Sequence, residues 1–327
     1  MLKEKKLLLF VTDALGYEKD INIKMQEMGI FVDYYNERPS VSFLTKVLIR
    51  INRSFLSWKI EKYYNMICSK EANKNYNYIF FVKGEAVSTR ILQRLRIEHP
   101  NAKMILYLWD SIQNNKNALV NYPYFDKVFS FDKNDAKRYN FLFRPLFYTD
   151  AYKEIATYNN FMYDALFVGT VHSDRYSYIK KIEQQLRNTG KTMMSYLLFR
   201  SPILYYRKKM FDRTFKNAQR RDFQFIPLSK KEVIKLVAQS RCLIDVQHPK
   251  QTGLTIRTIE ALGSCRKLIT TNETIKEYDF YNPNNILIVD RHNPLIKREF
   301  LEGEYEKLNV NIYDTYSLGS WIKDLLL

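Results

Sequence analysis

At 327 residues the chain is long enough for two domains, since about 150 residues is the usual size of one. Its 46% hydrophobic content with only 9 Gly and 9 Pro indicates a globular protein and excludes a disordered one. No apolar stretch approaches the roughly 20 residues that span a bilayer. The formal net charge of +17 calls for an anionic partner or a compositional explanation.

This charge is spread over both halves of the sequence, so it is not an appended basic tail. Diffuse positive charge fits nucleic acid, an anionic membrane or phosphorylated small molecules, and a lysine-rich composition without any partner is the alternative. The basic segment 200–221 is typical of a solvated helix, with RNA binding as its alternative. The amphipathic segment 41–67 predicts a core helix with a basic face, or one that also touches an anionic membrane surface.

Cysteine usage and the first residues bear on the compartment. Cys68, Cys242 and Cys265 show no metal-binding spacing, which favours a reducing environment. The apolar run near the start is short and is followed by Thr12 and Asp13, so a first strand is expected there rather than a signal peptide. We therefore expect a cytoplasmic protein.

Strands and helices alternate in the first half, which predicts a parallel α/β sheet. The expected strands are 5–12, 29–35, 78–82, 104–108 and 127–131, and the expected helices are 18–28, 88–98 and 132–139. Ligands of such sheets lie beyond the carboxyl ends of the strands. Asp13, Glu85 and Asp110 follow three of these strands and are our candidate catalytic carboxylates.

The alternation breaks within residues 141–160, and a second α/β series follows. We therefore predict an N-terminal domain of residues 1–150 and a C-terminal domain of residues 151–327. The second series comprises strands 164–168, 242–246, 267–271 and 286–289, helices 174–187 and 229–240, and a last helix 317–327 that packs back on the body.

A phosphate-suited unit occupies residues 240–272. Its strand is followed by the loop Gly253-Leu254-Thr255 and by a helix that carries Arg257 and Glu260 one turn apart. Backbone N–H groups at a helix N-terminus favour anions. Glu260 could accept hydrogen bonds from a ribose or sugar diol, and the alternative is an exposed ion pair between Arg257 and Glu260.

Several nucleotide-binding signatures are absent from the sequence. There is no GxGxxG after the first strand, no GxxxxGK[ST], no GxSxG and no Asp-x-Asp pair. The four histidines are scattered, so no metal site is expected. What remains is a site that binds a diphosphate without metal. Its parts are the backbone N–H groups of residues 253–255 and the cationic side chains of Arg175 and Arg257.

Four segments carry a resemblance to a known family: 107–139, the strand and loop Phe167-Val168-Gly169-Thr170 with Arg175, the helix 253–262, and 267–281. Together they resemble the GT-B-fold glycosyltransferases of bacterial capsule, exopolysaccharide and lipopolysaccharide biosynthesis, and distantly the CgeB-like proteins. The resemblance implies two Rossmann-like domains that face each other across a cleft, the second binding the donor.

The resemblance also implies roles for individual residues. The glutamate that matches Glu260 binds donor ribose in the family, and Gly169, Thr170 and Arg175 open the donor domain. Many retaining members carry a second glutamate eight positions earlier, where this chain has Thr252. Retention and inversion of anomeric configuration are therefore both open.

The function so implied is transfer of a sugar from a nucleotide-diphosphate sugar to a glycan or lipid-linked glycan, with no cofactor or metal. A carboxylate (Asp110, Asp13 or Glu85) would take the acceptor proton in the inverting case. Contact with the anionic inner face of the plasma membrane is expected, and a nucleic-acid partner is not. The alternatives are a nucleic-acid-binding protein and a catalytically inactive GT-B-like scaffold.

Overall fold

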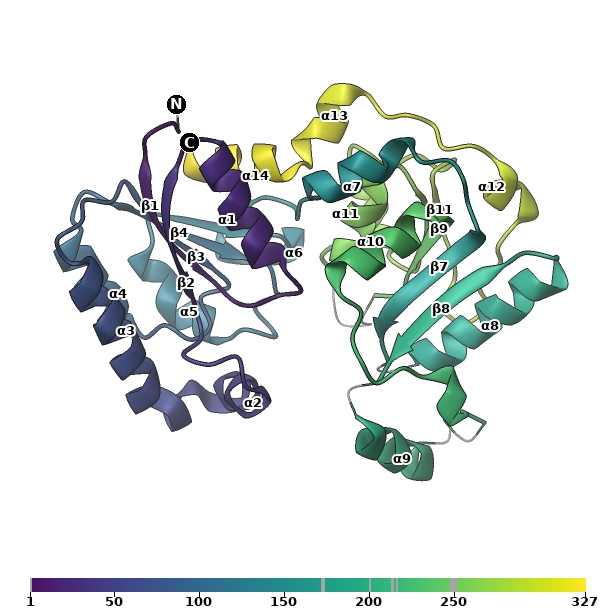
Figure 1. Ribbon diagram of the computed structural model, residues 1–327, viewed down its shortest axis with the longest axis horizontal. Coiled ribbons are helices and arrows are strands. Elements are labelled where there is room, and N and C mark those ends of the chain that lie inside the picture. Colours follow the sequence, from purple (N-terminus) through teal and green to yellow (C-terminus); the bar gives the residue numbers. More distant parts are fainter. Residues whose placement is uncertain (1, 172–173, 200, 213–214, 216, 248–251) are drawn as a thin grey trace. The chain divides into compact units, whose positions relative to one another are not determined.

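The computed structural model describes residues 2–171, 174–199, 201–212, 215, 217–247 and 252–327 (Figure 1). The chain divides into two compact units, Met1–Leu146 with Leu318–Leu327 and Phe147–Ser317. The sequence predicts a domain boundary after residue 150, and the structure divides the chain after Leu146. The C-terminal helix, which we had grouped with the second domain, belongs to the first unit.

The first unit is a doubly wound, wholly parallel sheet in the order β2-β1-β3-β4-β5-β6. Its strands are β1 (Lys6–Val11), β2 (Phe31–Asn36), β3 (Tyr78–Val82), β4 (Lys103–Leu108), β5 (Lys127–Ser130) and β6 (Leu142–Phe143). Its helices are α1 (Tyr17–Glu27), α2 (Phe43–Asn52), α3 (Ser57–Glu71), α4 (Thr89–Glu98), α5 (Asn117–Asn121), α6 (Lys133–Tyr139) and α14 (Leu318–Leu326).

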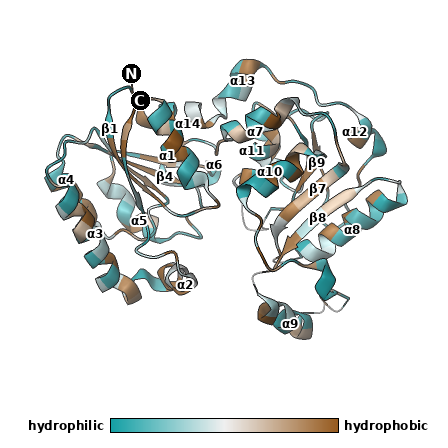
Figure 2. Ribbon diagram, viewed as in Figure 1, coloured by the Kyte–Doolittle hydropathy of each residue, from teal (hydrophilic) through white to brown (hydrophobic). Residues whose placement is uncertain are grey.

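Apolar runs explain why the central strands form where they do. All five residues of β3 are buried, as are five of the six in β4, because helices cover both faces of a parallel sheet. These strands are accordingly among the hydrophobic ribbons of Figure 2. The side chains of Ser88 and Asp132 accept N–H groups at the starts of α4 and α6, where the sequence predicts that these helices begin.

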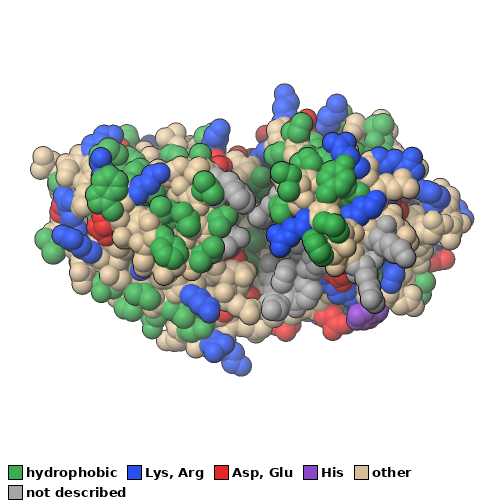
Figure 3. Space-filling view, turned by 90° about the horizontal axis from the view of Figure 1, so that it is seen from below, with side chains coloured by type: hydrophobic (Ala, Val, Ile, Leu, Met, Phe, Trp, Pro, Cys, Tyr) green, Lys and Arg blue, Asp and Glu red, His purple; other side chains and the backbone are tan. Residues whose placement is uncertain are grey.

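The amphipathic segment 41–67 does not form one core helix. It is divided into α2, a 3₁₀ turn (Arg53–Leu56) and α3, and the Asn52 side chain accepts the Ser54 N–H at the break. Leu44, Ile51, Phe55 and Trp58, expected to share a buried face, are 67–75% exposed. Figure 3 shows hydrophobic and basic side chains mixed on the surface of each unit. The side chains of Lys46 and Arg50 lie outside what the structure describes.

The second unit repeats the winding of the first, with a parallel sheet in the order β11-β10-β9-β7-β8. Its strands are β7 (Tyr163–Thr170), β8 (Met193–Leu198), β9 (Ser240–Asp245), β10 (Lys267–Thr270) and β11 (Ile286–Ile288). Its helices are α7 (Asp150–Glu154), α8 (Arg175–Asn188), α9 (Pro202–Phe211), α10 (Lys230–Ala238), α11 (Ile256–Gly263), α12 (Arg298–Glu302) and α13 (Val310–Thr315).

Two elements of the second unit differ in how well the sequence announces them. β8 is a strand that we did not expect, because its sequence MMSYLL is short and lacks alternation. The expected helix 229–240 is α10, and a capping box joins Ser229 and Glu232 at its start, as this Ser-x-x-Glu sequence predicts. In both sheets the strand first in the chain lies between the second and the third, so the winding reverses at β1/β3 and at β7/β9.

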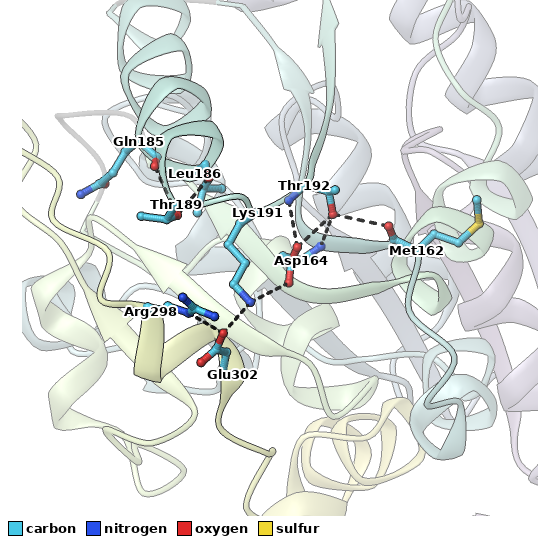
Figure 4. A network of polar contacts seen from close by, with 9 residues as sticks. All are labelled: Met162, Asp164, Gln185, Leu186, Thr189, Lys191, Thr192, Arg298 and Glu302. Carbon is cyan, nitrogen blue, oxygen red and sulfur yellow. Dashed lines mark hydrogen bonds and ion pairs between the residues drawn. The ribbon is translucent and has the colours of Figure 1, made fainter.

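A polar network fastens the last part of the second unit to the edge of its sheet (Figure 4). Lys191 lies between two carboxylates, 2.9 Å from Glu302 and 3.7 Å from Asp164. Asp164 in turn accepts the Thr192 N–H at 2.8 Å. These contacts tie α12 to the turn that joins α8 and β8. Within the described residues, no helix is both long and apolar enough to cross a bilayer.

Gly263 provides a test of packing in α11. A Cβ there would lie 2.4 Å from Cβ and Cγ of Tyr148. Alanine favours a helix over glycine by about 1 kcal/mol, but overpacking costs about 1–3 kcal/mol and more in a tight contact. We expect Gly263→Ala to lower the free energy of unfolding in urea. The control is Gly319→Ala in α14, where the nearest atom, Cε of Lys24, is 3.5 Å away. A Gly263→Ala protein as stable as the control would contradict this packing.

Candidate functional site

The switch point of the second sheet is bridged by one guanidinium group. Arg175, the first residue of α8, donates from Nη1 to the Thr170 carbonyl at 2.9 Å and from Nη2 to the Val246 carbonyl. These carbonyls lie at the carboxyl ends of β7 and β9. Burial lowers the pKa of Arg175, and nearby Asp245 opposes that shift. Its Nε–H is buried without an acceptor among the described residues.

Gly169 makes room for this arginine. A Cβ at this position would lie 2.9 Å from the Phe167 ring and 3.4 Å from Nη1 of Arg175. The guanidinium also lies 5.7 Å from the centre of the Phe167 ring. A glycine is therefore needed because the arginine and the ring occupy the space beside the strand, with no unusual backbone conformation involved.

The N-terminus of α11 lies in the loop after β9. The Thr255 side chain caps the helix by accepting the Thr258 N–H. The N–H groups of Leu254 and Thr255 have no acceptor among the described residues. The Thr252 carbonyl accepts from Thr274 Oγ1 at 3.0 Å, which holds the loop in place. The helix start thus offers N–H groups and a positive dipole end to an anion.

Arg257 and Glu260 form the i,i+3 ion pair that the spacing allows, at 2.6 Å. It is not an exposed pair, since the Arg257 and Glu260 side chains are only 16% and 5% exposed. Tyr152 of α7 donates its hydroxyl to Oε1 of Glu260 at 2.6 Å. A carboxylate has about four lone-pair sites and is a suitable acceptor for the hydroxyl groups of a ligand.

Asp245, the last residue of β9, is a buried carboxylate that we did not single out from the sequence. Burial raises its pKa, while Thr255, Thr258 and the charges of Arg175 and Arg257 lower it. The hydroxyl of Thr258 lies 3.4 Å from its Oδ2. An acid inside the apolar run 242–246 was the available signal. Asp245 balances the charge of two arginines and orders the start of α11.

The carboxyl ends of β3 and β4 in the first unit carry a second charged cluster. Lys83 lies 2.9 Å from Glu85 and 3.5 Å from Asp110. Arg38, which follows β2, donates to the same Glu85 carboxylate. The structure therefore joins two of the three predicted carboxylates through one lysine. Asp13 is exposed in the loop after β1 and does not line the cavity beside Glu85 and Asp110 that is described below.

Glu37 and Glu85 have environments that separate their pKa values. Burial would raise the pKa of Glu85, but the charges of Lys83 and Arg38 outweigh it and lower the pKa below 4.5. Burial and the nearby charge of Glu85 raise the pKa of Glu37 to about 8. Glu37 accepts the N–H groups of Gly84 and Ala86, at 3.1 and 2.8 Å. It holds the loop that carries Lys83 and Glu85.

Lys83 has a backbone conformation that residues other than glycine rarely adopt, with φ at 94°. Such a conformation costs about 1–3 kcal/mol and persists only where neighbours impose it. The Lys83 carbonyl accepts from Asn115 at 2.6 Å, and that of Gly84 accepts from Asn121 at 3.1 Å. In this conformation the Lys83 ammonium group lies between Glu85 and Asp110.

A cavity of about 460 Å³ opens beside this cluster. Glu85, Asp110 and Ile51 line it, together with residues 113–117, which are four amide side chains and Lys116. Amides and carboxylates at this density suit a ligand with many hydroxyl groups. The sequence QNNKN between two strands was the signal for this wall, and our sequence analysis passed over it.

No group of three or more His, Cys, Asp or Glu side chains able to hold a metal ion occurs in the described part of the chain. Whether the chain works without metal is not decided by this observation and stays a prediction.

No protein-family model and no curated protein sequence match this chain. Solved structures do match it over nearly the whole length of both chains. Anabaena Alr3699/HepE in complex with UDP and glucose has 9% identity, a TM-score of 0.58 and coverage of 99% of each chain. The catalytic domain of Arabidopsis thaliana starch synthase IV, bound to ADP and acarbose, has 7% identity, a TM-score of 0.58 and the same coverage.

A third match is the UDP-GlcNAc 2-epimerase of Methanocaldococcus jannaschii in complex with UDP-GlcNAc and UDP. It has 12% identity, a TM-score of 0.54 and coverage of 98% of this chain and 99% of that one. Identities this low establish the fold alone. The chain therefore has the two-domain α/β architecture of the GT-B fold, as predicted, and its likeness to CgeB-like proteins stays a prediction.

Glu85 offers a stability test of the first cluster. Glu85→Gln leaves Arg38 and Lys83 buried without their carboxylate, which should cost about 3 kcal/mol at pH 7. Because the folded-state pKa of Glu85 lies below its unfolded value, the unfolded chain binds more protons between the two. The stabilisation is thus present above pH 4.5 and is lost as the pH falls through the folded-state pKa.

Urea unfolding at pH 7 and at successively lower pH measures this effect, and the gap between wild type and Glu85→Gln should narrow on acidification. Glu27→Gln is the control, since the Lys24–Glu27 pair is exposed and should contribute only about 0.5 kcal/mol. A gap that stays constant with pH would show that Glu85 does not carry the charge assigned to it.

Proposed function

We propose that this chain is a glycosyltransferase that moves a sugar from a nucleotide-diphosphate sugar to a glycan or lipid-linked glycan acceptor in cell-surface polysaccharide synthesis. The observation that carries the proposal is the construction of the β7/β9 switch point. There a partly buried arginine at the start of α8 lies with the N-terminus of α11, whose first N–H groups are unused, and with a firmly held glutamate of α11.

Each part of this site suits one part of a donor. The N–H groups of Leu254 and Thr255 and the charge of Arg175 suit a diphosphate, whose negative charge grows as the bond to the sugar breaks. Glu260, held by Tyr152 and Arg257, suits the hydroxyl pair of a ribose. Because these groups supply positive charge themselves, we propose that transfer needs no divalent metal.

The ligands of the similar structures support this assignment. UDP with glucose, UDP with UDP-GlcNAc, and ADP with acarbose are bound by three proteins that share the fold. Each of these complexes thus contains a nucleoside diphosphate, and two of the three also contain a sugar that is not part of a nucleotide sugar.

For the first unit we propose that Asp110 is the general base that takes the acceptor proton. Its side chain is 28% exposed and lines the amide-rich cavity, and Lys83 lies 3.5 Å away. Glu85 is 6% exposed and bound by two cations, which weakens it as a base. Ile51 of α2 lines this cavity and is one of the exposed apolar side chains of α2 and α3. These side chains would suit a lipid-linked acceptor at a cytoplasmic membrane face.

A second candidate function is epimerisation of a nucleotide sugar, favoured by the similarity to the Methanocaldococcus jannaschii epimerase. The two reactions differ in their products, since transfer releases a nucleoside diphosphate and an epimerase leaves the nucleotide sugar with unchanged mass. Mass spectrometry of a nucleotide sugar incubated with the protein and with acceptor glycans distinguishes them.

The donor site is tested by a thermal-shift panel of nucleoside diphosphates and nucleotide sugars. A ligand at 100 times its Kd stabilises the folded protein by about 2.7 kcal/mol, so the melting temperature should rise for the matching nucleotide. Glu260→Ala should abolish the rise. Glu260→Gln keeps an acceptor for the Tyr152 hydroxyl, so a lost rise in this variant reports lost ligand binding and not lost folding. Glu273→Ala, at an exposed glutamate of the same unit, is the control and should behave like wild type. If no member of the panel shifts the wild-type protein, the proposal fails.

The base is tested by Asp110→Asn, which keeps the shape of the side chain and its contact with Asn114. Loss of a general base lowers the rate by about 10²–10⁴-fold, whereas nucleotide binding in the second unit should not change. Sugar transfer from the donor found in the panel is the measurement, and Asp13→Asn is the control. Full activity of Asp110→Asn with loss in Asp13→Asn would move the role to Asp13.

A further inference from the structure

A cavity in the second unit lies at the opposite ends of the strands from the candidate donor site. It has a volume of about 400 Å³. Phe161 just before β7, Arg241 near the start of β9 and Lys267 at the start of β10 all line it. It therefore sits at the amino ends of strands whose carboxyl ends form the donor site.

The cavity is strongly cationic. Arg241, Arg266, Lys267 and Lys307 line it, and Glu304 is the one acidic residue among the described residues of its wall. None of the four cations forms an ion pair with a described carboxylate. Uncompensated charge of one sign in a concave site concentrates counter-ions.

Two of these cations are buried, which is costly without a counter-charge. Arg266 is 2% exposed and donates only to backbone carbonyls, among them those of Ile155 and Tyr158 at 2.9 and 2.8 Å. Lys267 is 3% exposed and donates to the Phe300 carbonyl at 2.8 Å. Burial lowers the pKa of Arg266 to about 10 and also lowers the pKa of Lys267. Neutral carbonyls position both groups without cancelling their charge.

Arg241 and Arg266 lie on one aromatic ring. Their guanidinium carbons are 5.1 and 4.9 Å from the centre of the Phe161 ring. Each stacking contact is favourable, but two like charges repel each other around the shared ring. A bound anion would relieve that repulsion, and guanidinium forks match phosphate oxygens.

The far wall of the cavity is a fixed part of the fold. Residues 303–307 follow α12, which the Lys191–Glu302 contact ties to the sheet edge (Figure 4). Gly303 allows the Lys267 ammonium group to approach, because a Cβ there would lie 2.9 Å from Nζ. The cations are therefore held in place around the cavity, as a preformed binding site requires.

We propose that this cavity binds a small phosphate-bearing molecule, at a site separate from the donor site. Its volume falls within the range of ligand pockets, roughly 300–1,000 Å³. Arg266 directly follows the turn that ends α11, so the cavity borders one end of the helix whose other end holds the candidate donor site. The proposal does not depend on glycosyl transfer.

Cys265 gives a direct readout, because it lines the cavity and is partly exposed, whereas Cys68 and Cys242 are buried. Pyrophosphate should slow alkylation of Cys265 by iodoacetamide, by about tenfold at ten times its Kd. Sodium chloride at equal ionic strength should not. In the double variant Arg241→Gln with Lys307→Gln, which leaves the buried Arg266 and Lys267 in place, the protection should be lost.

The matched control is Arg221→Gln with Lys276→Gln, which removes one exposed arginine and one exposed lysine elsewhere in the unit. It should retain protection, and so should Glu260→Gln, since its change lies in the donor site. Equilibrium dialysis of labelled pyrophosphate supplies a second measurement, in which the double variant loses one binding site. Equal protection by chloride, or pyrophosphate binding that is unchanged in the double variant by both measurements, overturns the proposal.

Discussion

The bridging of two strand ends by Arg175 is the constraint on which the candidate donor site depends. Parallel strands that diverge at a switch point leave carbonyl groups without strand partners, and the guanidinium group satisfies one on each side. Glycine at position 169 favours this contact, because a Cβ there would lie 2.9 Å from the Phe167 ring on which the guanidinium group packs. The contact also places a positive charge next to Asp245, which in turn orders the start of α11. One guanidinium group thus links the ends of β7 and β9 and lies near the acid that contacts α11.

In the first unit the central group at the strand ends is an anion, whereas in the second it is the Arg175 cation. At the strand ends of the first unit a carboxylate, Glu85, is held between the cations of Lys83 and Arg38. Glu37 anchors the loop through backbone N–H groups and gives up its proton less readily than Glu85. The result is a fixed cluster of charges beside a cavity lined by amide groups, which suits hydroxyl-rich ligands. Both units therefore place polar chemistry at the carboxyl ends of their strands, although their sequences show no internal repeat.

Much of the fold could be predicted from the sequence, because buried parallel strands are continuous apolar runs with polar residues at their ends. The run 78–82 and the cap at Asp132 show this directly. The strand β8 could not, because its sequence is short and lacks alternation. The break in segment 41–67 could not either, because a local cap by the Asn52 side chain interrupts an otherwise continuous amphipathic pattern. Within the sites, Glu260 and Arg175 followed from motif resemblance. Tyr152 and Arg38 did not, because each reaches its partner from a distant part of the chain.

The central claim is that a nucleoside diphosphate binds at the β7/β9 switch point, and a crystal structure of the protein with UDP or the nucleotide selected by thermal shift tests it most directly. The account predicts phosphate oxygens within hydrogen-bonding distance of the Leu254 and Thr255 N–H groups, with the ribose hydroxyls at Glu260. A nucleotide bound elsewhere, with these N–H groups and Glu260 untouched, would contradict it.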